Sequence, residues 1–334
     1  MIRLQLQELE EKILSPLAAL SSRTRGREFP EEECEIRTPF QRDRDRVIHS
    51  KAFRRLKHKT QVFISPEGDH YRTRLTHTLE VAQIARTVAR ALRLNEDLTE
   101  AIGLGHDLGH TPFGHAGEDA LNSVYRPGFR HNEQSLRVVE RLERRTTDFP
   151  GLNLTWEVRD GIWHHTGEVL PATLEGRIVR IADRVAYINH DIDDAIRAGV
   201  ISAEQLPKES INLLGTNSSA RIDHMVKDLI TSSLDQGDIK MSPEVREATN
   251  RLRSFLFDKV YIGSLAKTEE GKAKAVLQSL FGHFVSYPRE LAEELTVEAF
   301  EDVERAAVDF IAGMTDRYAV AEYGKHFLPS AWTR

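Results

Sequence analysis

The residue types with the greatest chemical potential are concentrated in one short stretch, EAIGLGHDLGHTPFGHAGEDALN at residues 100–122. Its imidazole and carboxyl side chains are His106, Asp107, His110, His115, Glu118 and Asp119. Five glycines are interspersed among them, and each disfavours a helix interior by roughly 1 kcal/mol relative to alanine. A stretch so poorly suited to being only a helix, and so rich in metal ligands and proton carriers, indicates a functional site.

The adjacent pair His106-Asp107 predicts part of a metal site. The two side chains cannot share one helical stripe, but at a helix end both can face one ion. His77 lies upstream beside an apolar helix face, and Asp183 lies in the apolar run RIVRIADRVAYI, where an unpaired carboxylate is costly to bury. His77, His106, Asp107 and Asp183 together offer two nitrogen and two oxygen ligands. Such a mixed set suits Mn, Fe, Co, Ni or Zn better than Mg or Ca, which prefer oxygen ligands alone.

Two further groups fall at helical spacing. His115 and Glu118 are three residues apart, so on a helix the carboxylate can orient the imidazole and raise its basicity. Such a pair suits general acid/base chemistry near neutral pH, although a surface ion pair is the alternative. Asp183, Tyr187 and Asp191 recur every four residues beside an apolar stripe, which places metal and substrate along one helix unless Asp191 belongs to a solvated helix end.

Arginine and lysine residues near His77 suggest phosphate binding. Arg74 precedes His77 by one helical turn, so its guanidinium can bind a phosphate oxygen bidentately. The same role is predicted for Arg55 and Lys57. Both belong to a basic segment between residues 42 and 59, which favours a local anion such as a phosphate, or else a solvated helix face.

Composition narrows the class of protein. The chain has 334 residues, with 40% hydrophobic and 29% charged residues, one cysteine and a net charge of −6. The acidic balance argues against a surface built wholly for nucleic acid. The absence of a long apolar run argues against a membrane span, and a single cysteine excludes an intramolecular disulfide. We expect a cytoplasmic protein stabilised by packing.

Hydrophobic periodicity predicts an all-α fold. The first expected helices are residues 1–14, a basic helix from Thr38 to about Lys59, and a helix from Thr73 to Leu94. The next is capped by Asp97 or Thr99 and runs through Leu108. The remaining expected helices cover 115–124, 132–144, 154–165 and 174–198, with C-terminal helices near 243–260, 267–285, 288–295 and 297–321. We divide the chain into an N-terminal helix and polar loop (1–37), a catalytic core (38–200) and a C-terminal helical region packed on that core (201–334).

These motifs resemble a known family. His77, His106-Asp107 and Asp183 on helices resemble the metal ligands of the HD-domain phosphohydrolases. HDLGHTPFGHAGE at 106–118 resembles their deoxynucleoside triphosphate triphosphohydrolase branch, the bacterial dGTPase-like proteins. RTPFQRDRDRVIHSKAFRRLKHKTQVF at 37–63, YRTRLTHTLEVAQIAR at 71–86, RIADRVAYINHDIDD at 180–194 and DFIAGMTDRYA at 309–319 agree with this family. The similarity implies an HD-domain helical core with a C-terminal extension.

The resemblance also implies roles for individual residues. His115 and Glu118 would form a catalytic pair and His110 would contact the substrate phosphates, with His131 a further candidate for that pocket wall. Arg184 would hold a phosphate, Tyr187 would pack near the sugar, and Asp191 would accept a hydrogen bond from the 3′-hydroxyl. Gln61 would also bind the 3′-hydroxyl, and Val62 would lie near C2′ and exclude a ribose.

The implied reaction is metal-dependent hydrolysis of a dNTP, including dGTP, at the α-phosphorus, which gives deoxynucleoside and inorganic triphosphate. A divalent ion (Mn, Mg, Co, Fe or Ni) is the expected cofactor. The resemblance also implies a homo-oligomer, tetramer or hexamer, and leaves open whether a second dNTP binds as an effector. We expect no membrane partner. The alternatives are an HD phosphohydrolase acting on another nucleotide, such as a cyclic dinucleotide or alarmone, and a nucleotide-sensing or single-stranded nucleic-acid-binding HD protein.

Overall fold

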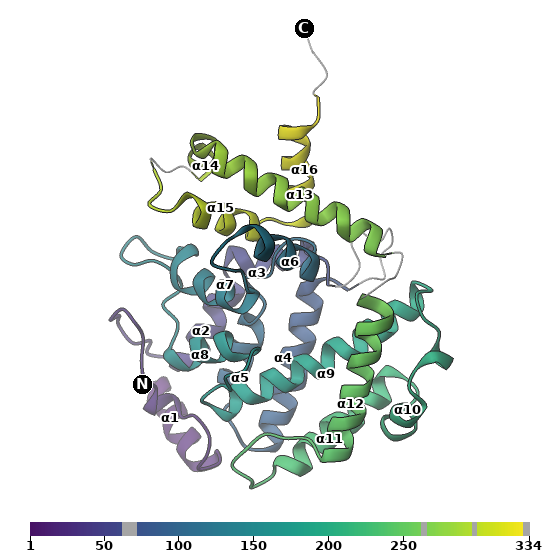
Figure 1. Cartoon of the computed structure of the whole chain (residues 1–334). Helices are drawn as coiled ribbons and strands as arrows, with labels where there is room; N and C mark the ends of the chain where they lie inside the picture. The colour runs from purple at the N-terminus through teal and green to yellow at the C-terminus, as the bar shows by residue number, and fades with distance from the viewer. Residues whose placement is uncertain (62–71, 262–265, 296–298, 330–334) are drawn as a thin grey trace.

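The computed structural model describes residues 1–61, 72–261, 266–295 and 299–329, and these form an all-α protein (Figure 1). Within these ranges the β-type contacts are isolated bridges, such as the one between Thr60 and Thr73. The predicted fold class is therefore confirmed. No helix of the described part of the chain is long and apolar enough to cross a membrane.

The α-helices range in length from 5 residues in α3 to 24 residues in α9. The N-terminal half contains α1 (Ile2–Ile13), α2 (Pro39–Ile48), α3 (Lys51–Arg55), α4 (Arg74–Ala91), α5 (Glu96–Gly105), α6 (Gly114–Val124), α7 (His131–Arg137), α8 (Trp156–His164) and α9 (Leu174–Arg197). The C-terminal half contains α10 (Lys208–Leu214), α11 (Ser218–Ser233), α12 (Pro243–Leu256), α13 (Ala266–Ser286), α14 (Pro288–Leu295), α15 (Val303–Ala312) and α16 (Asp316–Phe327).

A first hydrophobic core surrounds α4, α5 and α9, the helices that carry the predicted metal ligands. Its fully buried members include Val81, Ala85, Ile102 and Ile188. Each of these helices starts at a defined cap: Thr73 forms a capping box, and the Asn95 side chain accepts from the backbone N–H of Leu98. Capping satisfies backbone donors that would otherwise lack partners at the helix start. Helices α10 to α12 contribute to the same core.

A second hydrophobic core lies between α6 and the outer layer formed by α13 to α16 (Figure 1). Leu121 of α6 packs with Leu277 and Phe284 of α13 and with Ile311 of α15 in this core. Helix α6 therefore belongs in sequence to the central region but is covered by the C-terminal layer. The division of the chain at residues 37 and 200 remains a prediction.

Three predicted helices have different bounds in the structure. The basic segment is two helices rather than one, because Ser50 caps a new helix by accepting from the N–H of Phe53. Helix α5 is capped by Asn95 instead of Asp97 or Thr99, and it ends at Gly105 rather than Leu108. The last predicted helix, 297–321, is interrupted between α15 and α16, where Thr315 caps the new helix.

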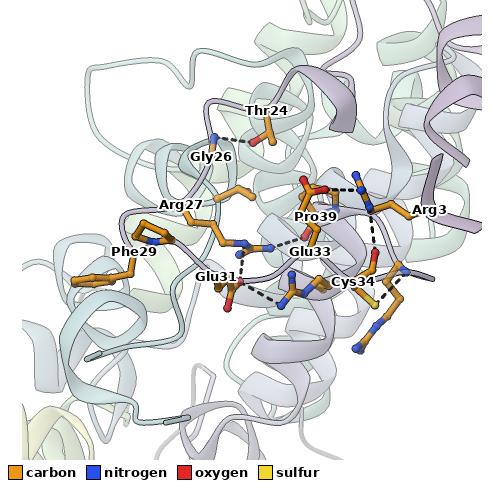
Figure 2. A pocket seen from close by; sticks show the side chains of 13 residues that line it. Arg3, Thr24, Gly26, Arg27, Phe29, Glu31, Glu33, Cys34 and Pro39 are labelled. Carbon is orange, nitrogen blue, oxygen red and sulfur yellow. Dashed lines mark hydrogen bonds and ion pairs between the residues drawn. The ribbon is translucent and has the colours of Figure 1, made fainter. Parts of the chain in front are cut away.

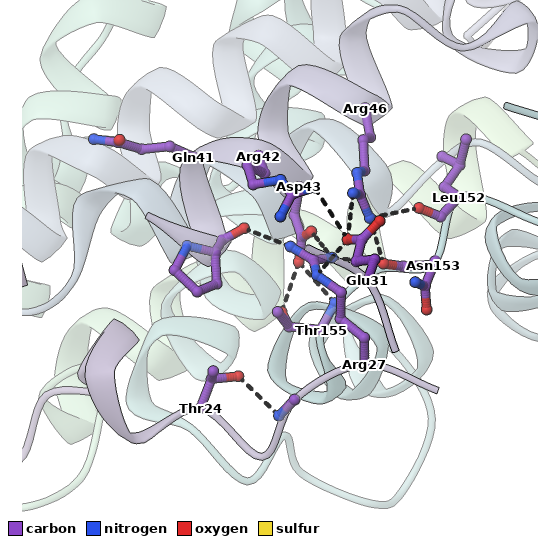
Figure 3. Close-up of polar contacts among 12 residues, drawn as sticks. Thr24, Arg27, Glu31, Gln41, Arg42, Asp43, Arg46, Leu152, Asn153 and Thr155 are labelled. Atoms are coloured by element: carbon purple, nitrogen blue, oxygen red, sulfur yellow. Dashed lines mark hydrogen bonds and ion pairs between the residues drawn. The ribbon is translucent and has the colours of Figure 1, made fainter. Parts of the chain in front are cut away.

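Arg42 and Arg46 of the basic segment hold the N-terminal loop in place (Figure 3). The buried carboxylate of Asp43 accepts from the backbone N–H and hydroxyl of Thr155, both at 2.7 Å, and pairs with Arg27. Arg46 also donates to the backbone oxygen of Leu152 at 3.0 Å. Arg42 and Arg46 are therefore paired within the protein, which favours a structural role for these two residues over the predicted anion site.

The same loop encloses a pocket of about 220 Å³ (Figure 2). Arg3 of α1 donates to the backbone oxygen of Cys34 at 3.1 Å, and the backbone N–H of Arg37 donates to its sulfur at 3.4 Å. Backbone hydrogen bonds from Arg37 and Ile36 lower the pKa of the Cys34 thiol to about 7. The side chain is partly exposed, so the loop holds its cysteine in a state that ionises easily.

Candidate active site

The predicted metal ligands converge from three helices. His77 is on α4, His106 caps the C-terminus of α5 with Asp107 following it, and Asp183 is on α9. The Nε2 atom of His77 lies 3.1 Å from Asp183 Oδ1 and 4.0 Å from Asp107 Oδ2. The Nε2 atom of His106 lies 3.5 Å from Asp107 Oδ1 and 3.8 Å from Asp183 Oδ1. These separations fit donors arranged around one ion at metal–ligand distances of about 2.1 Å.

Hydrogen bonding prepares His106 to be a ligand. Its Nδ1 atom lies 2.7 Å from the carbonyl oxygen of Gly103, which can only accept, so Nδ1 carries the proton and Nε2 keeps its lone pair. Nε2 is buried and has no hydrogen-bond partner within the described residues. A buried lone pair without a partner costs free energy, and a divalent ion bound here would satisfy it. The donor set therefore fits a metal.

The charges of the two carboxylates also suit a cation. Burial alone would raise the pKa of Asp107, but His106, His110 and Arg74 hold it well below its usual value. The pKa of Asp183 is about 2, because a hydrogen bond from His77 and the nearby imidazoles outweigh burial. Both groups are therefore ionised at neutral pH and offer two negative charges.

A second group of side chains lies beside this centre, around Glu118. The ring of His131 approaches both oxygens of Glu118 at 3.0 Å, and its backbone N–H donates to Oε1 at 2.8 Å. His115, the predicted partner, is farther away at 3.6 Å, and its side chain is 73% exposed. Glu118 is thus held chiefly by His131, while His115 points into more open space on the cavity wall.

His165 belongs to the same group and was not predicted. Its Nδ1 atom donates to the backbone oxygen of Ile162 at 2.7 Å, so in the neutral ring Nε2 accepts from His131 Nε2 at 3.2 Å. Burial, with help from His106, lowers the pKa of His165 to about 3. The pKa of His131 is raised, since the bond to Glu118 outweighs burial. His131 therefore favours the imidazolium form between a carboxylate and a neutral imidazole.

The two groups share a cavity of about 540 Å³. Its lining includes Arg74, His110, Gln61, Tyr187, Asp191, Tyr261 and three of the four predicted metal ligands, His77, Asp107 and Asp183. Tyr261, from the turn after α12, donates a short hydrogen bond to Asp191. Arg253 also lines the cavity. Neither residue was predicted, because both lie far along the chain in a segment without a recognisable motif.

Several predicted substrate-binding residues lie away from this cavity. Arg55 and Lys57 are exposed, and Arg55 lines a different cavity, of about 860 Å³, between the core and the C-terminal layer. The separate helix α3 carries Arg55 to that side, close to Gly313. Arg184 is half-buried and does not line the central cavity. Val62 lies outside the described residues.

The segment 309–319 supports the site from behind. The ammonium of Lys59 donates to the backbone oxygens of both His110 and Ala312. The carboxylate of Asp316 accepts from the backbone N–H of Thr60 at 2.9 Å and of Phe113 at 3.0 Å. These bonds tie the C-terminal layer to the turn that carries His110, which gives a physical role to DFIAGMTDRYA.

Two family models and several curated relatives match this chain. Residues 74–188 match the model of the HD domain, and residues 239–325 match that of a phosphohydrolase-associated domain. A deoxyguanosinetriphosphate triphosphohydrolase-like protein of Caldanaerobacter subterraneus subsp. tengcongensis is 62% identical over 98% of this chain and 96% of its own length. One from Desulfatibacillum aliphaticivorans is 49% identical over 98% and 99%. A phosphohydrolase of known structure from Bacteroides thetaiotaomicron is 22% identical with a TM-score of 0.48, covering 81% of this chain and 60% of that one.

The match to the HD model includes His77, His106, Asp107 and Asp183, the residues that converge in the structure. Near-complete coverage of both chains extends the relationship to the C-terminal layer. This chain belongs to the HD-domain phosphohydrolases, among the deoxyguanosinetriphosphate triphosphohydrolase-like proteins.

Proposed function

We propose that this protein hydrolyses deoxynucleoside triphosphates, with dGTP the first to test, at the α-phosphorus. Water attacks the α-phosphorus, the bond to O5′ breaks, and the products are a deoxynucleoside and inorganic triphosphate. The names of the close relatives support the substrate class. The arrangement of unpaired polar atoms around one cavity supports the way in which such a substrate would bind.

That arrangement is the observation on which the proposal depends. Buried polar atoms without a hydrogen-bond partner among the described residues include Nε and Nη2 of Arg74, Nδ1 of His110, Oδ1 of Asp191 and Oε1 of Gln61. All four residues line the central cavity. Leaving such atoms unpaired costs about 1–3 kcal/mol each, so they favour a ligand that has both anionic oxygens and hydroxyl donors.

The unpaired atoms include hydrogen-bond donors for phosphate oxygens and hydrogen-bond acceptors for sugar hydroxyl groups. Arg74 Nη1 already donates to Asp107 at 2.8 Å, which fixes the guanidinium and leaves Nε and Nη2 for phosphate oxygens. Burial and Arg74 keep the pKa of His110 well below its usual value, so the neutral ring can donate a hydrogen bond to phosphate. Asp191 and the side-chain oxygen of Gln61 would accept from the sugar hydroxyl.

The metal site would hold a divalent ion through His77, His106, Asp107 and Asp183. Such an ion polarises a phosphate oxygen and makes water a better nucleophile. The departing O5′ must gain a proton, and His115 and His131 are the two imidazoles on the cavity wall beside Glu118. His115 is the more open of the two to a substrate.

A product assay tests the proposal. The full-length protein is given each dNTP singly and in pairs with Mn or Mg in ¹⁸O-labelled water, and nucleoside and triphosphate are separated. We expect deoxynucleoside and triphosphate carrying the label. Asp107→Asn should reduce turnover on the order of 10³-fold or more, while the exposed control Asp235→Asn should match the wild type.

Other products would contradict the assignment. A nucleoside diphosphate or monophosphate as product would mean that the substrate binds with a different phosphorus atom beside the metal site. No turnover with any dNTP, alone or in pairs, would favour the nucleotide-sensing or nucleic-acid-binding alternative. His115→Gln and His131→Gln separate the two acid candidates, because only loss of the true proton donor removes the high-pH limb of the pH–rate profile.

A further inference from the structure

A second cluster of metal-ligand side chains lies in the outer C-terminal layer, far along the chain from the HD site. It consists of His283 at the end of α13, Glu290 in the first turn of α14, and His326 in the last turn of α16. Figure 1 shows these three helices in the outer layer above the core. One ligand atom from each residue can be chosen so that all lie within 4.8 Å of one another.

The distances are those of a nearly assembled site. His283 Nε2 lies 2.8 Å from Glu290 Oε2, and His326 Nδ1 lies 3.5 Å from the same oxygen. The two imidazole rings have centroids 4.1 Å apart. Ligand atoms around a tetrahedral zinc ion are about 3.4 Å apart, given bond lengths near 2.1 Å, so small adjustments would bring these three atoms around one ion.

The second nitrogen of His326 has an outer partner. Its Nε2 atom lies 3.3 Å from Glu322 Oε2, and both side chains are 9% exposed. Nε2 nevertheless makes no hydrogen bond of good geometry. A carboxylate behind a ligating imidazole is the usual outer shell of a metal site, where it fixes the ring and raises its basicity. His326 is thus flanked by a ligand carboxylate on one side and an orienting carboxylate on the other.

An ion-pair cluster without metal is the simpler explanation. It explains the contact between His283 and Glu290, because one imidazolium and one carboxylate make a normal pair. It explains the second imidazole less well, since two imidazolium rings 4.1 Å apart would repel each other even with Glu290 and Glu322 beside them. Two neutral imidazoles and one carboxylate around a divalent ion have no such conflict.

We propose that His283, Glu290 and His326 bind a borderline divalent ion of the zinc class, with Glu322 as the orienting residue. Two imidazole nitrogens and one carboxylate oxygen are a donor set that zinc prefers. Glu290 is 46% exposed, so the fourth position is open to water. The ion would join α13, α14 and α16, and α13 packs in the second core against α6, the helix that carries Glu118.

Zinc stoichiometry tests this inference independently of the proposed reaction. Because the HD site would also hold metal, the measurements use metal-stripped protein that carries His106→Gln and Asp107→Asn together, which leaves one imidazole and one carboxylate of the four predicted ligands. This protein is called the HD-site double variant. Isothermal titration with zinc is expected to give one equivalent per chain. That equivalent should disappear on adding His326→Gln or His283→Gln, and should persist with the control His224→Gln on α11. Glu322→Gln should weaken binding about 10- to 100-fold without changing the stoichiometry.

A thermal measurement gives a second readout. Zinc should raise the unfolding temperature of the HD-site double variant by several degrees and leave that of its His326→Gln derivative unchanged. Unfolding in EDTA checks that each variant folds, and Glu290→Gln replaces any that does not. Equal zinc binding with and without the cluster substitutions, or no binding to the HD-site double variant, would show that the residues form only an ion-pair cluster.

Discussion

Asp191 is a substrate-binding candidate whose ionisation is strongly altered by its surroundings. The side chain is 3% exposed, and Oδ1 has no hydrogen-bond partner within the described residues. Burial raises its pKa to about 7 even though a hydrogen bond from Tyr261 opposes the change. Near neutral pH the carboxyl group of Asp191 is thus divided between its protonated and ionised states.

This shift predicts a pH-dependent stability. In the unfolded chain the group titrates near its model value of 3.8, and in the folded protein at about 7. Between these values the folded state binds more protons, so the free energy of unfolding falls as the pH rises through this range. Asp191→Asn keeps an acceptor for Tyr261 and cannot ionise. We expect it to be more stable than the wild type at pH 8, by at most about 4 kcal/mol, and similar at pH 4.

Urea unfolding at both pH values, without metal or nucleotide, measures the difference. A gain of the same size at pH 4 and pH 8 would point to packing rather than ionisation. Tyr261→Phe provides the matched comparison, because it removes the hydroxyl and leaves the titrating carboxyl group. Its pH dependence should be at least as steep as that of the wild type.

At the residue scale, sequence predicts those contacts that a helix imposes. His106 and Asp107 are neighbours, and Asp183, Tyr187 and Asp191 recur at one spacing, so their common orientation follows from helix geometry. His165 and Tyr261 are brought in by tertiary packing, from positions 34 residues beyond His131 and 70 beyond Asp191. Nothing local marks them. The assignment of Glu118 to His115 was reasonable at helical spacing, but the loop before α7 brings His131 closer.

At the level of elements, the turn after α5 is held against α7. The backbone N–H of Gly109 donates to Ser135 Oγ at 2.9 Å, and that hydroxyl donates to the carbonyl oxygen of His106 at 2.7 Å. A Cβ atom on Gly109 would lie 2.1 Å from the backbone nitrogen of Ser135. Only glycine allows α7, whose first residue is His131, to approach the metal ligands so closely.

Gly109→Ala should therefore push α7 away from the turn after α5, which carries Asp107 and His110. We expect a loss of about 1–3 kcal/mol in the free energy of unfolding, together with reduced turnover, because the stacked rings of His110 and His131, 4.2 Å apart, would move relative to each other. Gly271→Ala is the matched control. A Cβ there meets nothing within 4 Å, so the change should stabilise α13 by up to about 1 kcal/mol. If both variants unfolded alike in urea, the close approach at Gly109 would not matter.

Helix existence was more predictable than helix boundaries. The apolar stripes of α4 and α9 extend over many turns, so periodicity identifies them, and the structure places them at Arg74–Ala91 and Leu174–Arg197. The break between α2 and α3 depends on one hydroxyl, that of Ser50, which caps α3. A single serine among basic residues does not stand out in sequence, and local capping competes with continued helix by only about 1 kcal/mol.

On the scale of the whole molecule, the C-terminal layer supports the candidate active site. Asp316 is buried, and its carboxylate accepts from the backbone N–H groups of Thr60 and Phe113. Phe113 has a left-handed backbone conformation, with φ of 62°, which costs a non-glycine residue roughly 1–3 kcal/mol. The hydrogen bond from Phe113 to Asp316 helps to hold this conformation, and α6, with Glu118, begins at the next residue.

Asp316→Asn should weaken the contact between the C-terminal layer and the two backbone segments at Thr60 and Phe113. An amide offers one acceptor oxygen and one donor group, so at least one of the two backbone N–H groups loses its partner inside the protein. That loss should cost about 1–3 kcal/mol of unfolding free energy. It should also lower kcat about 10-fold or more, because the turn bearing His110 and the start of α6 would shift relative to Arg74. Mn²⁺ affinity should change little, since none of the four predicted metal ligands contacts Asp316.

Asp223→Asn gives the appropriate comparison for Asp316→Asn. Asp223 forms an exposed ion pair with Lys227 on α11, and its substitution should change stability by less than about 0.5 kcal/mol. Urea unfolding and dNTP turnover of the two variants would be measured side by side. Asp316→Asn protein with the stability and kcat of Asp223→Asn would mean that the C-terminal layer only covers the core. A selective loss in Asp316→Asn would mean that it holds the catalytic turn in its strained conformation.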